Sequence, residues 1–288
     1  MRDLLTIAEL GRDGIEAILA LSQRRDLGGT LTGRGVALVF QKPSARTRNS
    51  MEMAVVQLGG HPVYIQKEEV GLGTRESAED VARTLACYHA IIAARVTDHS
   101  DLERMAAATD TPVLNMLSDS AHPLQALADL MTMRQLLGTL AGARIAYVGD
   151  ANNVCRSLAE ACSLVGAELA IAAPQGYRLG EALEHVTHTN DPVEAVAGAQ
   201  IVYTDVWVSM GQDEEAEARM EALAPYQVNE ALMARCPGAW FLHCLPARRG
   251  EEVTPGILES ARSAVWQQAE NRMHTARGAL AWLAGAAR

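Results

Sequence analysis

Short apolar runs alternate along the chain with longer segments in which apolar residues recur every three or four positions. The runs are four or five residues long and mostly apolar, which is typical of parallel strands buried on both faces. The longer segments have the period of helices that bury one side. The predicted strands cover residues 36–40, 61–65, 90–94, 113–117, 145–148, 169–173, 201–204 and 240–243. One amphipathic helix is predicted from Ile7 to Arg25, and a polar, glycine-rich loop from Gln66 to Thr74.

This alternation predicts an α/β protein of two domains, each a parallel sheet flanked by helices. A long helix is predicted from His122 to about Gly138, and after the turn that follows it the alternation starts again. The second series needs a core of its own, so we place the domain boundary in or near this helix. A chain of 288 residues has room for two domains of ordinary size.

The composition narrows the class of partner. The formal net charge is -10, which disfavours nucleic acid and anionic membranes as partners but leaves room for a local basic pocket. No apolar run approaches the ~18 residues of a membrane span, and the first residues do not resemble a signal peptide. The five cysteines are scattered, without a Cys-x-x-Cys pair, so we expect neither a disulfide framework nor structural zinc, and a cytoplasmic location.

The turn after the first predicted strand, Gln41 to Ser50, is the strongest candidate for chemistry. It leads into a helix, and the free amides at a helix N-terminus suit an anion. Ser44 and Thr47 add hydroxyl donors, and Arg46 and Arg48 add guanidinium groups that match phosphate. The alternative is a capped helix with two solvated arginines. Basic residues in the turn of an acidic chain favour the phosphate site.

Two further polar groups follow strands of the first half. Arg95 closes the strand at 90–94, and a structural arginine is the alternative. His122-Pro123-Leu124-Gln125 opens the long helix, with Pro123 at the position where proline is favoured. His122 and Gln125 are three residues apart and can point to one ligand, although a capping histidine beside a solvated glutamine is the simpler reading.

The second half carries three strand-end segments. Residues 148–153 form a strand-to-helix turn that lacks Gly-x-Gly-x-x-Gly, so a dinucleotide site has weak support. Residues 205–211 read Asp-Val-Trp-Val-Ser-Met-Gly, and residues 243–246 read His-Cys-Leu-Pro. Cys244 could be a nucleophile, but neighbours on a strand face opposite ways, so we do not expect a direct pair with His243.

Taken together, these segments resemble the aspartate/ornithine carbamoyltransferase family. The motifs are the Ser-x-Arg-Thr-Arg turn, the His-Pro-x-Gln quartet, the Asp-x-x-x-Ser-Met-Gly loop and His-Cys-Leu-Pro, and they cover nearly the whole chain in the family's order. The Asp-x-x-x-Ser-Met-Gly loop is the feature that separates ornithine enzymes from aspartate enzymes. The resemblance implies carbamoyl transfer from carbamoyl phosphate to the δ-amine of L-ornithine, in arginine biosynthesis or the arginine deiminase route.

The resemblance also assigns the domains and the site residues. Residues 1–130 would bind carbamoyl phosphate, with the last helix, 270–288, packing back on them; residues 131–269 would bind ornithine, and long helices would join the two. The implied carbamoyl-phosphate residues are Ser44, Ala45, Arg46, Thr47, Arg95, His122, Gln125, Cys244, Leu245 and Arg272. The implied ornithine residues are Asn153, Asp205, Ser209 and Met210, and the implied catalytic residues are Arg95, His122, Cys244 and Arg272.

The implied mechanism needs no cofactor and no metal, because the substrate amine is itself the nucleophile. The donors to the developing oxyanion would be Arg95, His122, Thr47 and Arg272, and closure of the domains would exclude water. Family members form trimers or assemblies of trimers. The chain departs from the family pattern at Ala45, where a threonine is common, and at Gly71, where many relatives have glutamine or histidine.

Other function classes stay open at this point. A thiol hydrolase would use Cys244 as its nucleophile. A catalytically silent relative would bind carbamoyl phosphate or a protein partner without turnover. A closely related carbamoyltransferase would act on a different amine.

Overall fold

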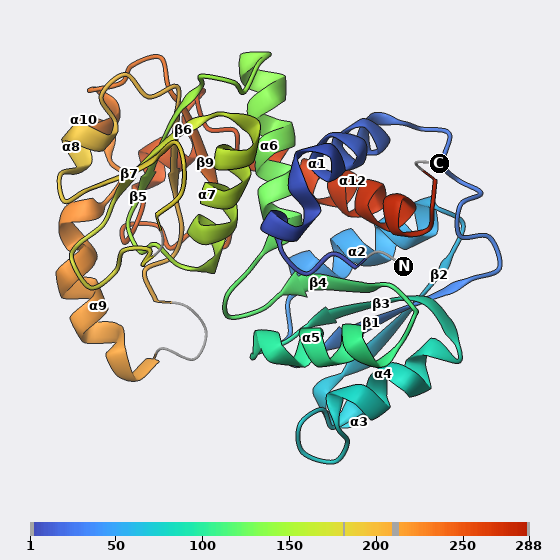
Figure 1. Ribbon diagram of the computed structural model, residues 1–288. Coiled ribbons are helices and arrows are strands. Elements are labelled where there is room, and N and C mark those ends of the chain that lie inside the picture. Colours follow the sequence, from blue (N-terminus) through green and yellow to red (C-terminus); the bar gives the residue numbers. More distant parts are fainter. Residues whose placement is uncertain (1–2, 181, 209–212, 287–288) are drawn as a thin grey trace. The chain divides into compact units, whose positions relative to one another are not determined.

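A computed structural model of the chain describes residues 3–180, 182–208 and 213–286. They fold into two compact units. Unit 1 comprises Met1–Ala128 together with Asn271–Arg288, and unit 2 comprises Asp129–Glu270. Each unit is a parallel sheet flanked by helices, which confirms the predicted fold class (Figure 1).

Unit 1 is built on a four-stranded sheet in the order β2-β1-β3-β4. Its strands are β1 (Gly35–Phe40), β2 (His61–Gln66), β3 (His89–Arg95) and β4 (Val113–Leu117). On one face lie α1 (Ile7–Gln23), α2 (Ala45–Gln57) and α12 (Val265–Leu283); on the other lie α4 (Ala78–Ala86) and α5 (His99–Ala108) (Figure 1). In register, Phe40 is paired with both Gln66 and Arg95, so the carboxyl ends of three strands meet at one edge.

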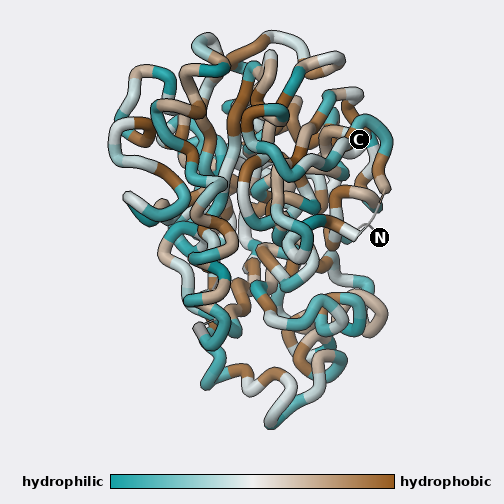
Figure 2. The backbone as a smooth tube through the Cα atoms, turned by 90° about the vertical axis from the view of Figure 1, so that its left-hand side faces the viewer, coloured by the Kyte–Doolittle hydropathy of each residue, from teal (hydrophilic) through white to brown (hydrophobic). Residues whose placement is uncertain are grey.

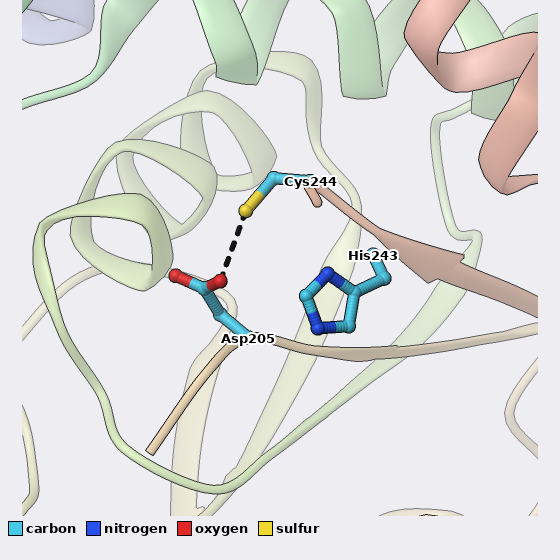
Figure 3. A group of neighbouring side chains, drawn as sticks. All are labelled: Asp205, His243 and Cys244. Carbon is cyan, nitrogen blue, oxygen red and sulfur yellow. Dashed lines mark hydrogen bonds between the residues drawn. The ribbon is translucent and has the colours of Figure 1, made fainter. Parts of the chain in front are cut away.

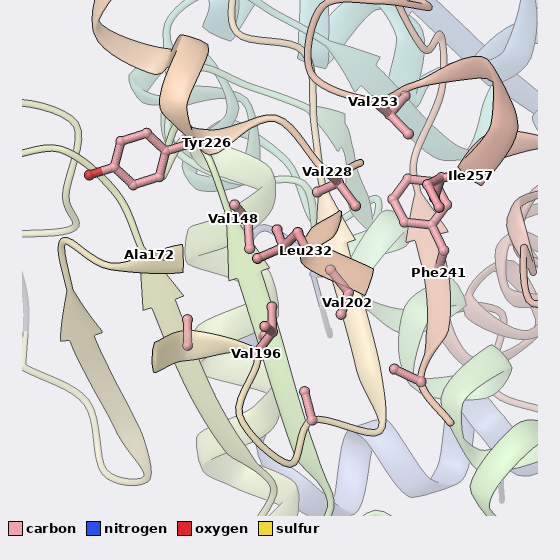
Figure 4. Packing of buried hydrophobic residues seen from close by; sticks show 14 of the residues in the cluster. Val148, Ala172, Val196, Val202, Tyr226, Val228, Leu232, Phe241, Val253 and Ile257 are labelled. Atoms are coloured by element: carbon pink, nitrogen blue, oxygen red, sulfur yellow. The ribbon is translucent and has the colours of Figure 1, made fainter. Parts of the chain in front are cut away.

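Unit 2 is built on a five-stranded parallel sheet in the order β7-β6-β5-β8-β9. Its strands are β5 (Arg144–Val148), β6 (Glu168–Ala172), β7 (Val186–Thr189), β8 (Ile201–Thr204) and β9 (Trp240–His243). Its helices include α7 (Asn153–Val165), α8 (Pro192–Ala195), α9 (Ala216–Leu223), α10 (Glu230–Met233) and α11 (Pro255–Leu258). Val148, Val202 and Phe241 from neighbouring strands pack against Leu232 of α10 and Ile257 of α11 (Figure 4).

The chain passes between the units inside two helices. One boundary falls within α6 (Pro123–Leu137), between Ala128 and Asp129, and the other within α12, between Glu270 and Asn271. Brown apolar stretches alternate with teal polar ones along the tube of Figure 2, as the sequence pattern predicts. Within the described ranges, no helix combines the length and the apolar character that crossing a bilayer requires.

Three local features differ from the sequence prediction. Helix α1 has a kink at Gly11, where φ is 64°, inside a segment predicted as one helix. The predicted polar loop at 66–74 contains the short helix α3 (Lys67–Val70), which ends at Gly71 with φ 59°. A left-handed helix end favours glycine, which explains the departure from the family pattern there. Strand β7 was not predicted because its residues, Val-Thr-His-Thr, are mostly polar.

Gly278 lets α12 approach α1 closely, and this contact yields a stability prediction. A Cβ at Gly278 would lie 2.7 Å from the Ile18 carbonyl oxygen and 2.9 Å from the Ser22 amide nitrogen. Gly278→Ala gains about 1 kcal/mol of helix propensity. Overpacking costs about 1–3 kcal/mol, and these backbone atoms cannot rotate away, so the free energy of unfolding should fall. Urea denaturation measures the change.

Gly29→Ala is the matched control for Gly278→Ala. No atom lies within 4 Å of a Cβ at Gly29, which is also in unit 1. Its free energy of unfolding should stay within about 0.5 kcal/mol of the parent value. Equal stability of the two variants would show that α1 and α12 do not pack as described.

Candidate active site

The turn before α2 has the geometry of an anion site. Ser44 is the N-cap of α2, and its hydroxyl oxygen accepts a hydrogen bond from the Thr47 amide at 3.3 Å. This cap fixes the first turn of the helix, whose amides carry positive partial charge. Ser44 is half-buried and Thr47 is buried, whereas Ala45 and Arg46 are exposed. The local fold therefore leaves Arg46 at the mouth of the turn.

The two arginines of this turn differ in what they contact. The Arg48 Nε donates to Glu52 at 2.8 Å, and the guanidinium lies 3.9 Å from the ring centroid of Tyr64. Arg46 makes no side-chain hydrogen bond or ion pair within the described part of the chain. The predicted phosphate contact from this turn therefore falls to Arg46, while Arg48 is held on the outer side of α2.

Arg95 reaches the same turn from the end of β3. It is only 6% exposed, and its Nη1 donates to the Thr47 hydroxyl at 3.3 Å. The pairing of Phe40 with Arg95 in the sheet explains this contact, because the turn begins directly after Phe40. A buried guanidinium beside free helix amides makes this corner of unit 1 strongly attractive to an anion.

His122 completes a group of four side chains, which we call the basic cluster. It consists of the basic residues Arg95, His122 and Arg272 together with the Thr47 hydroxyl that Arg95 contacts. His122 precedes α6 and is 7% exposed, while Arg272 lies on α12. Burial, and then the charges of Arg272 and Arg95, hold the pKa of His122 well below its usual value of 6.5. A neutral imidazole carries one N–H and can donate it to a carbonyl oxygen without adding charge. Gln125, in the first turn of α6, is also buried.

In unit 2, Asp205 is the centre of a second polar group, at the end of β8. The Asn152 side-chain amide donates to its Oδ2 at 2.8 Å, and the Val206 amide donates to its Oδ1 at 2.8 Å. The Cys244 thiol donates to Oδ1 at 3.0 Å, and Figure 3 shows these two side chains pointing toward each other. Asp205 is thus a buried carboxylate whose position is fixed from three segments.

His243 lies beside this group, but its two ring nitrogens interact with other residues. Its Nδ1 accepts a hydrogen bond from the Leu245 amide at 2.9 Å, and its Nε2 lies 3.1 Å from Glu252, with both side chains fully buried. An Nδ1 that accepts cannot carry a proton, so the ring is the neutral Nε2–H tautomer. A base for Cys244 would need a ring nitrogen with a free lone pair directed at the thiol. The lone pair of His243 Nδ1 instead accepts the Leu245 amide hydrogen, so it is not directed at Cys244.

The same three side chains are the candidate metal donors within the described ranges. The donor atoms of Asp205, His243 and Cys244 all lie within 4.8 Å of one another. A metal would have to displace the Leu245 amide from His243 and the Asn152 amide from Asp205. The existing hydrogen bonds suit a carboxylate kept ready for a cationic ligand better than a metal centre.

Asn153 and Leu245 are the remaining predicted residues within the described ranges. Asn153 is the first residue of α7 and is half-buried. Leu245 follows Cys244 with φ 61°, a conformation that costs a non-glycine residue about 1–3 kcal/mol and is often found at functional sites. Ser209 and Met210 lie outside the described residues. The roles assigned to all these residues stay predictions.

Sequence reasoning missed three residues that hold the site. Asn152 caps α7 by accepting from the Val154 and Cys155 amides, and at the same time it binds Asp205. Glu252 is fully buried against His243. Arg219 binds Asp150 from a distant helix. Only Asn152 had a signal in the sequence, as an asparagine directly before a predicted helix.

Asp150 and Arg219 form a nearly buried ion pair close to the start of α7. The Arg219 Nη1 lies 3.0 Å from Asp150 Oδ2 and also donates to the Trp207 carbonyl at 3.4 Å. Arg219 therefore ties the segment after Asp205 to the turn after β5. Burial raises the pKa of Asp150 to about 6, and Arg219 opposes this rise.

Comparison with protein families matches both halves of the chain. Residues 2–135 match the aspartate/ornithine carbamoyltransferase carbamoyl-P binding domain, and residues 141–283 match the Asp/Orn binding domain. Among similar sequences, the ornithine carbamoyltransferase of Thermus thermophilus is 46% identical over 97% of this chain and 95% of its own. The anabolic enzyme of Pyrococcus furiosus is 42% identical over 99% of this chain and 96% of its own.

Solved structures give the same result. The ornithine carbamoyltransferase of Pyrococcus furiosus superposes with a TM-score of 0.92 at 42% identity, covering 97% of this chain and 96% of that one. The anabolic enzyme of Campylobacter jejuni superposes with a TM-score of 0.93 at 29% identity, covering 98% and 99%. Each of these backbones matches that of the present chain closely, although the sequence identity falls from 42% to 29% between them.

The Asp150–Arg219 pair gives a prediction on protonation. Arg219→Met should raise the pKa of Asp150 above about 6, because removing the guanidinium leaves burial unopposed. Arg219→Lys keeps the charge and should leave the pKa close to the parent value. The side-chain carboxyl signal of Asp150, followed by NMR against pH, measures both. An unchanged or lower pKa in Arg219→Met would show that the pair does not form.

The raised pKa of Asp150 makes the free energy of unfolding depend on pH. The folded pKa of Asp150, about 6, exceeds its usual 3.8, so the folded state binds this proton more tightly than the unfolded state. As pH falls from above about 6 to below 3.8, Asp150 alone adds up to about 3 kcal/mol to the free energy of unfolding. His122, with a lowered pKa, acts in the opposite direction below pH 6.5. The site-resolved titration is needed because the two effects oppose each other.

Proposed function

The chain belongs to the aspartate/ornithine carbamoyltransferase family, and from this premise we propose that it transfers the carbamoyl group of carbamoyl phosphate to the δ-amine of L-ornithine. The products are L-citrulline and phosphate. The observation that carries the proposal is the chemical contrast between the two polar groups. Unit 1 gathers buried Arg95 and Arg272 around a neutral His122, whereas unit 2 fixes the single carboxylate of Asp205. The first suits a phosphate dianion and the second an ammonium group.

Carbamoyl phosphate binds in unit 1. Its phosphate is held by Ser44, by the amides of the first turn of α2 and by Arg46. Its carbonyl oxygen accepts from Arg95, His122 and Arg272, which are in place before negative charge develops there. The low pKa of His122 keeps the imidazole neutral, so it donates to this oxygen without transferring a full proton.

Ornithine binds in unit 2 through its amino-acid head. Asp205 pairs with the α-ammonium, and its orientation is supported by the hydrogen bonds from Asn152 and Cys244. Asn153 contributes at the start of α7. Ser209 and Met210, outside the described residues, complete the predicted set.

The chemistry needs no covalent enzyme intermediate. The neutral δ-amine attacks the carbamoyl carbon, and the carbonyl oxygen takes the electron pair. Collapse of the tetrahedral intermediate re-forms the carbonyl and breaks the carbon–oxygen bond to phosphate. The proton lost by the amine leaves with the phosphate, so atoms and charge balance. Cys244 orients Asp205 and the substrates.

The thiol hydrolase is disfavoured by the hydrogen bonds of His243. Both of its ring nitrogens are used, one by the Leu245 amide and one by Glu252, so it does not activate Cys244. A silent relative is disfavoured because the chain keeps every polar group that the proposed reaction uses. These are the cap at Ser44, Arg95, Arg272, His122 and Asp205. Assembly into trimers and a cytoplasmic location remain expectations; the five cysteines, all free thiols, fit a reducing compartment.

A direct assay tests the proposal. Purified protein given carbamoyl phosphate and L-ornithine should form citrulline and inorganic phosphate in equal amounts. Putrescine, which lacks the amino-acid head, should be a much poorer acceptor. Absence of citrulline from folded protein would overturn the proposal, and equal use of putrescine would overturn the assignment of ornithine.

Arg46→Ala should lower kcat/KM for carbamoyl phosphate by at least ~10²-fold. A charge-assisted hydrogen bond is worth about 1.5–3 kcal/mol, and the loss of positioning adds to it. Arg48→Ala is the control from the same turn, because Arg48 is engaged by Glu52 and Tyr64; it should stay within about threefold of the parent. If steady-state kinetics gave the two variants the same loss, the phosphate would not be bound by Arg46.

Asp205→Asn should raise the ornithine KM and lower kcat together by ~10- to 100-fold, because it removes an ion pair from a site of low water content. Binding of carbamoyl phosphate alone, measured by calorimetry, should stay close to the parent value. Asp191→Asn is the control, since Asp191 only caps α8 in the same unit. Equal weakening of both substrates in Asp205→Asn would argue that Asp205 supports the fold and does not bind ornithine.

A further inference from the structure

A second basic pocket lies in unit 1 and uses none of the residues of the basic cluster. Its volume is about 190 Å³, and its lining residues are Arg24, Arg25, Leu27, Gln57 and Arg277. They come from the end of α1, the end of α2 and the middle of α12. None of the lining residues is acidic, in a chain whose net charge is -10.

Arg277 is the buried part of this pocket, with 5% of its surface exposed. Its Nη2 donates to the carbonyls of Ser22 and Arg24 at 2.7 and 2.9 Å, and its Nη1 donates to Gln57 Oε1 at 2.8 Å. These oxygens are all neutral groups. Its Nε is buried and has no hydrogen-bond partner. Capping the end of α1 accounts for Nη2, but it leaves both the charge and the Nε donor of Arg277 uncompensated.

The neighbouring charges increase this imbalance. Arg25 is exposed, and no ion pair of its side chain is found in the described ranges. Arg24 is bound to Asp26, with 47% and 71% of the two side chains exposed to solvent. Burial, and then the charge of Arg25, lowers the pKa of Arg277, so two positive charges act on one another across the pocket. A bound anion would relieve this repulsion and satisfy the Nε donor.

We propose that this pocket, lined by Arg25, Arg277 and Gln57, is a binding site for a small tetrahedral oxyanion such as inorganic phosphate. The volume is several times the roughly 30 Å³ of one water molecule, yet below the roughly 300 Å³ of pockets for drug-sized ligands. It therefore fits a small anion and excludes a nucleotide. Arg277 and Arg25 supply the guanidinium donors, and the Gln57 side chain stays bound to Arg277.

The site joins α2 and α12, which carry Thr47 and Arg272 of the basic cluster. Gln57 is the last residue of α2, whose first turn holds Ser44 and Thr47. Arg277 is five residues beyond Arg272 on α12. An anion here holds the ends of α1 and α2 against α12, so it stabilises the folded state by mass action.

The Nε–H signal of Arg277 in a nitrogen–proton correlation spectrum of the full-length chain reports on the pocket directly. It is assigned by its loss in Arg277→Lys. Inorganic phosphate should shift this signal saturably, and sodium chloride of equal ionic strength should not. Arg25→Glu should weaken the apparent affinity by at least ~10-fold, because a charge-assisted contact becomes a repulsion. Arg25 is exposed, so this variant tests binding without disturbing the core.

Arg34→Glu is the matched control, an exposed arginine of unit 1 that does not line the pocket, and it should leave the phosphate response unchanged. The inference is overturned if phosphate does not move the signal, if chloride moves it equally, or if Arg25→Glu responds like the parent. Because the readout is independent of turnover, failure of the proposed reaction would leave this test intact.

Phosphate should also raise the thermal unfolding midpoint of the parent more than that of Arg25→Glu. Phosphate bound at Ser44 and Arg46 contributes equally in both proteins, so the difference belongs to the second pocket. Identical increases in the two proteins would contradict the inference.

Discussion

Burial of positive charge is the constraint on which unit 1 depends. Arg95 and Arg272 are almost fully enclosed, and a charge withdrawn from water must be compensated by partners or by a ligand. Burial, and then the charges of these two arginines, lower the pKa of His122, so the histidine is a hydrogen-bond donor that adds no third charge. The cap at Ser44 and the parallel register of β1 and β3 serve this arrangement, because they bring the helix amides and Thr47 to the same corner.

Most of the fold could be predicted from sequence because parallel strands are buried on both faces and read as short apolar runs. The strands at 113–117, 201–204 and 240–243 have the predicted bounds. Strand β7 escaped prediction because it is an edge strand whose polar residues carry no such run. The kink at Gly11 escaped because a single glycine does not interrupt the helical period of its neighbours.

The candidate site was predictable to the extent that its residues follow strands. Arg95, Asp205 and Cys244 all stand directly at or after a strand end, where a parallel sheet presents its ligand-binding edge. The residues that hold them were not predictable, since such partners are distant in sequence and obey no period. Arg219 meets Asp150 across 69 positions, and Asn152 meets Asp205 across 53. Arg48 is a residue that the motif suggested as a phosphate ligand but whose contacts do not support this role. It occupies the same turn as Arg46, yet its side chain is bound to Glu52.

The discontinuity of unit 1 has a consequence for the order in which the molecule is made. Unit 2 is a continuous stretch, so a ribosome finishes it before the residues of α12 that belong to unit 1 have been added. Until then the first 128 residues lack the helix that supplies Arg272 and the partner of α1 at Gly278. The unit that begins first is thus completed last, and a nascent chain acquires Arg272 and Arg277 only after its second sheet has been synthesised.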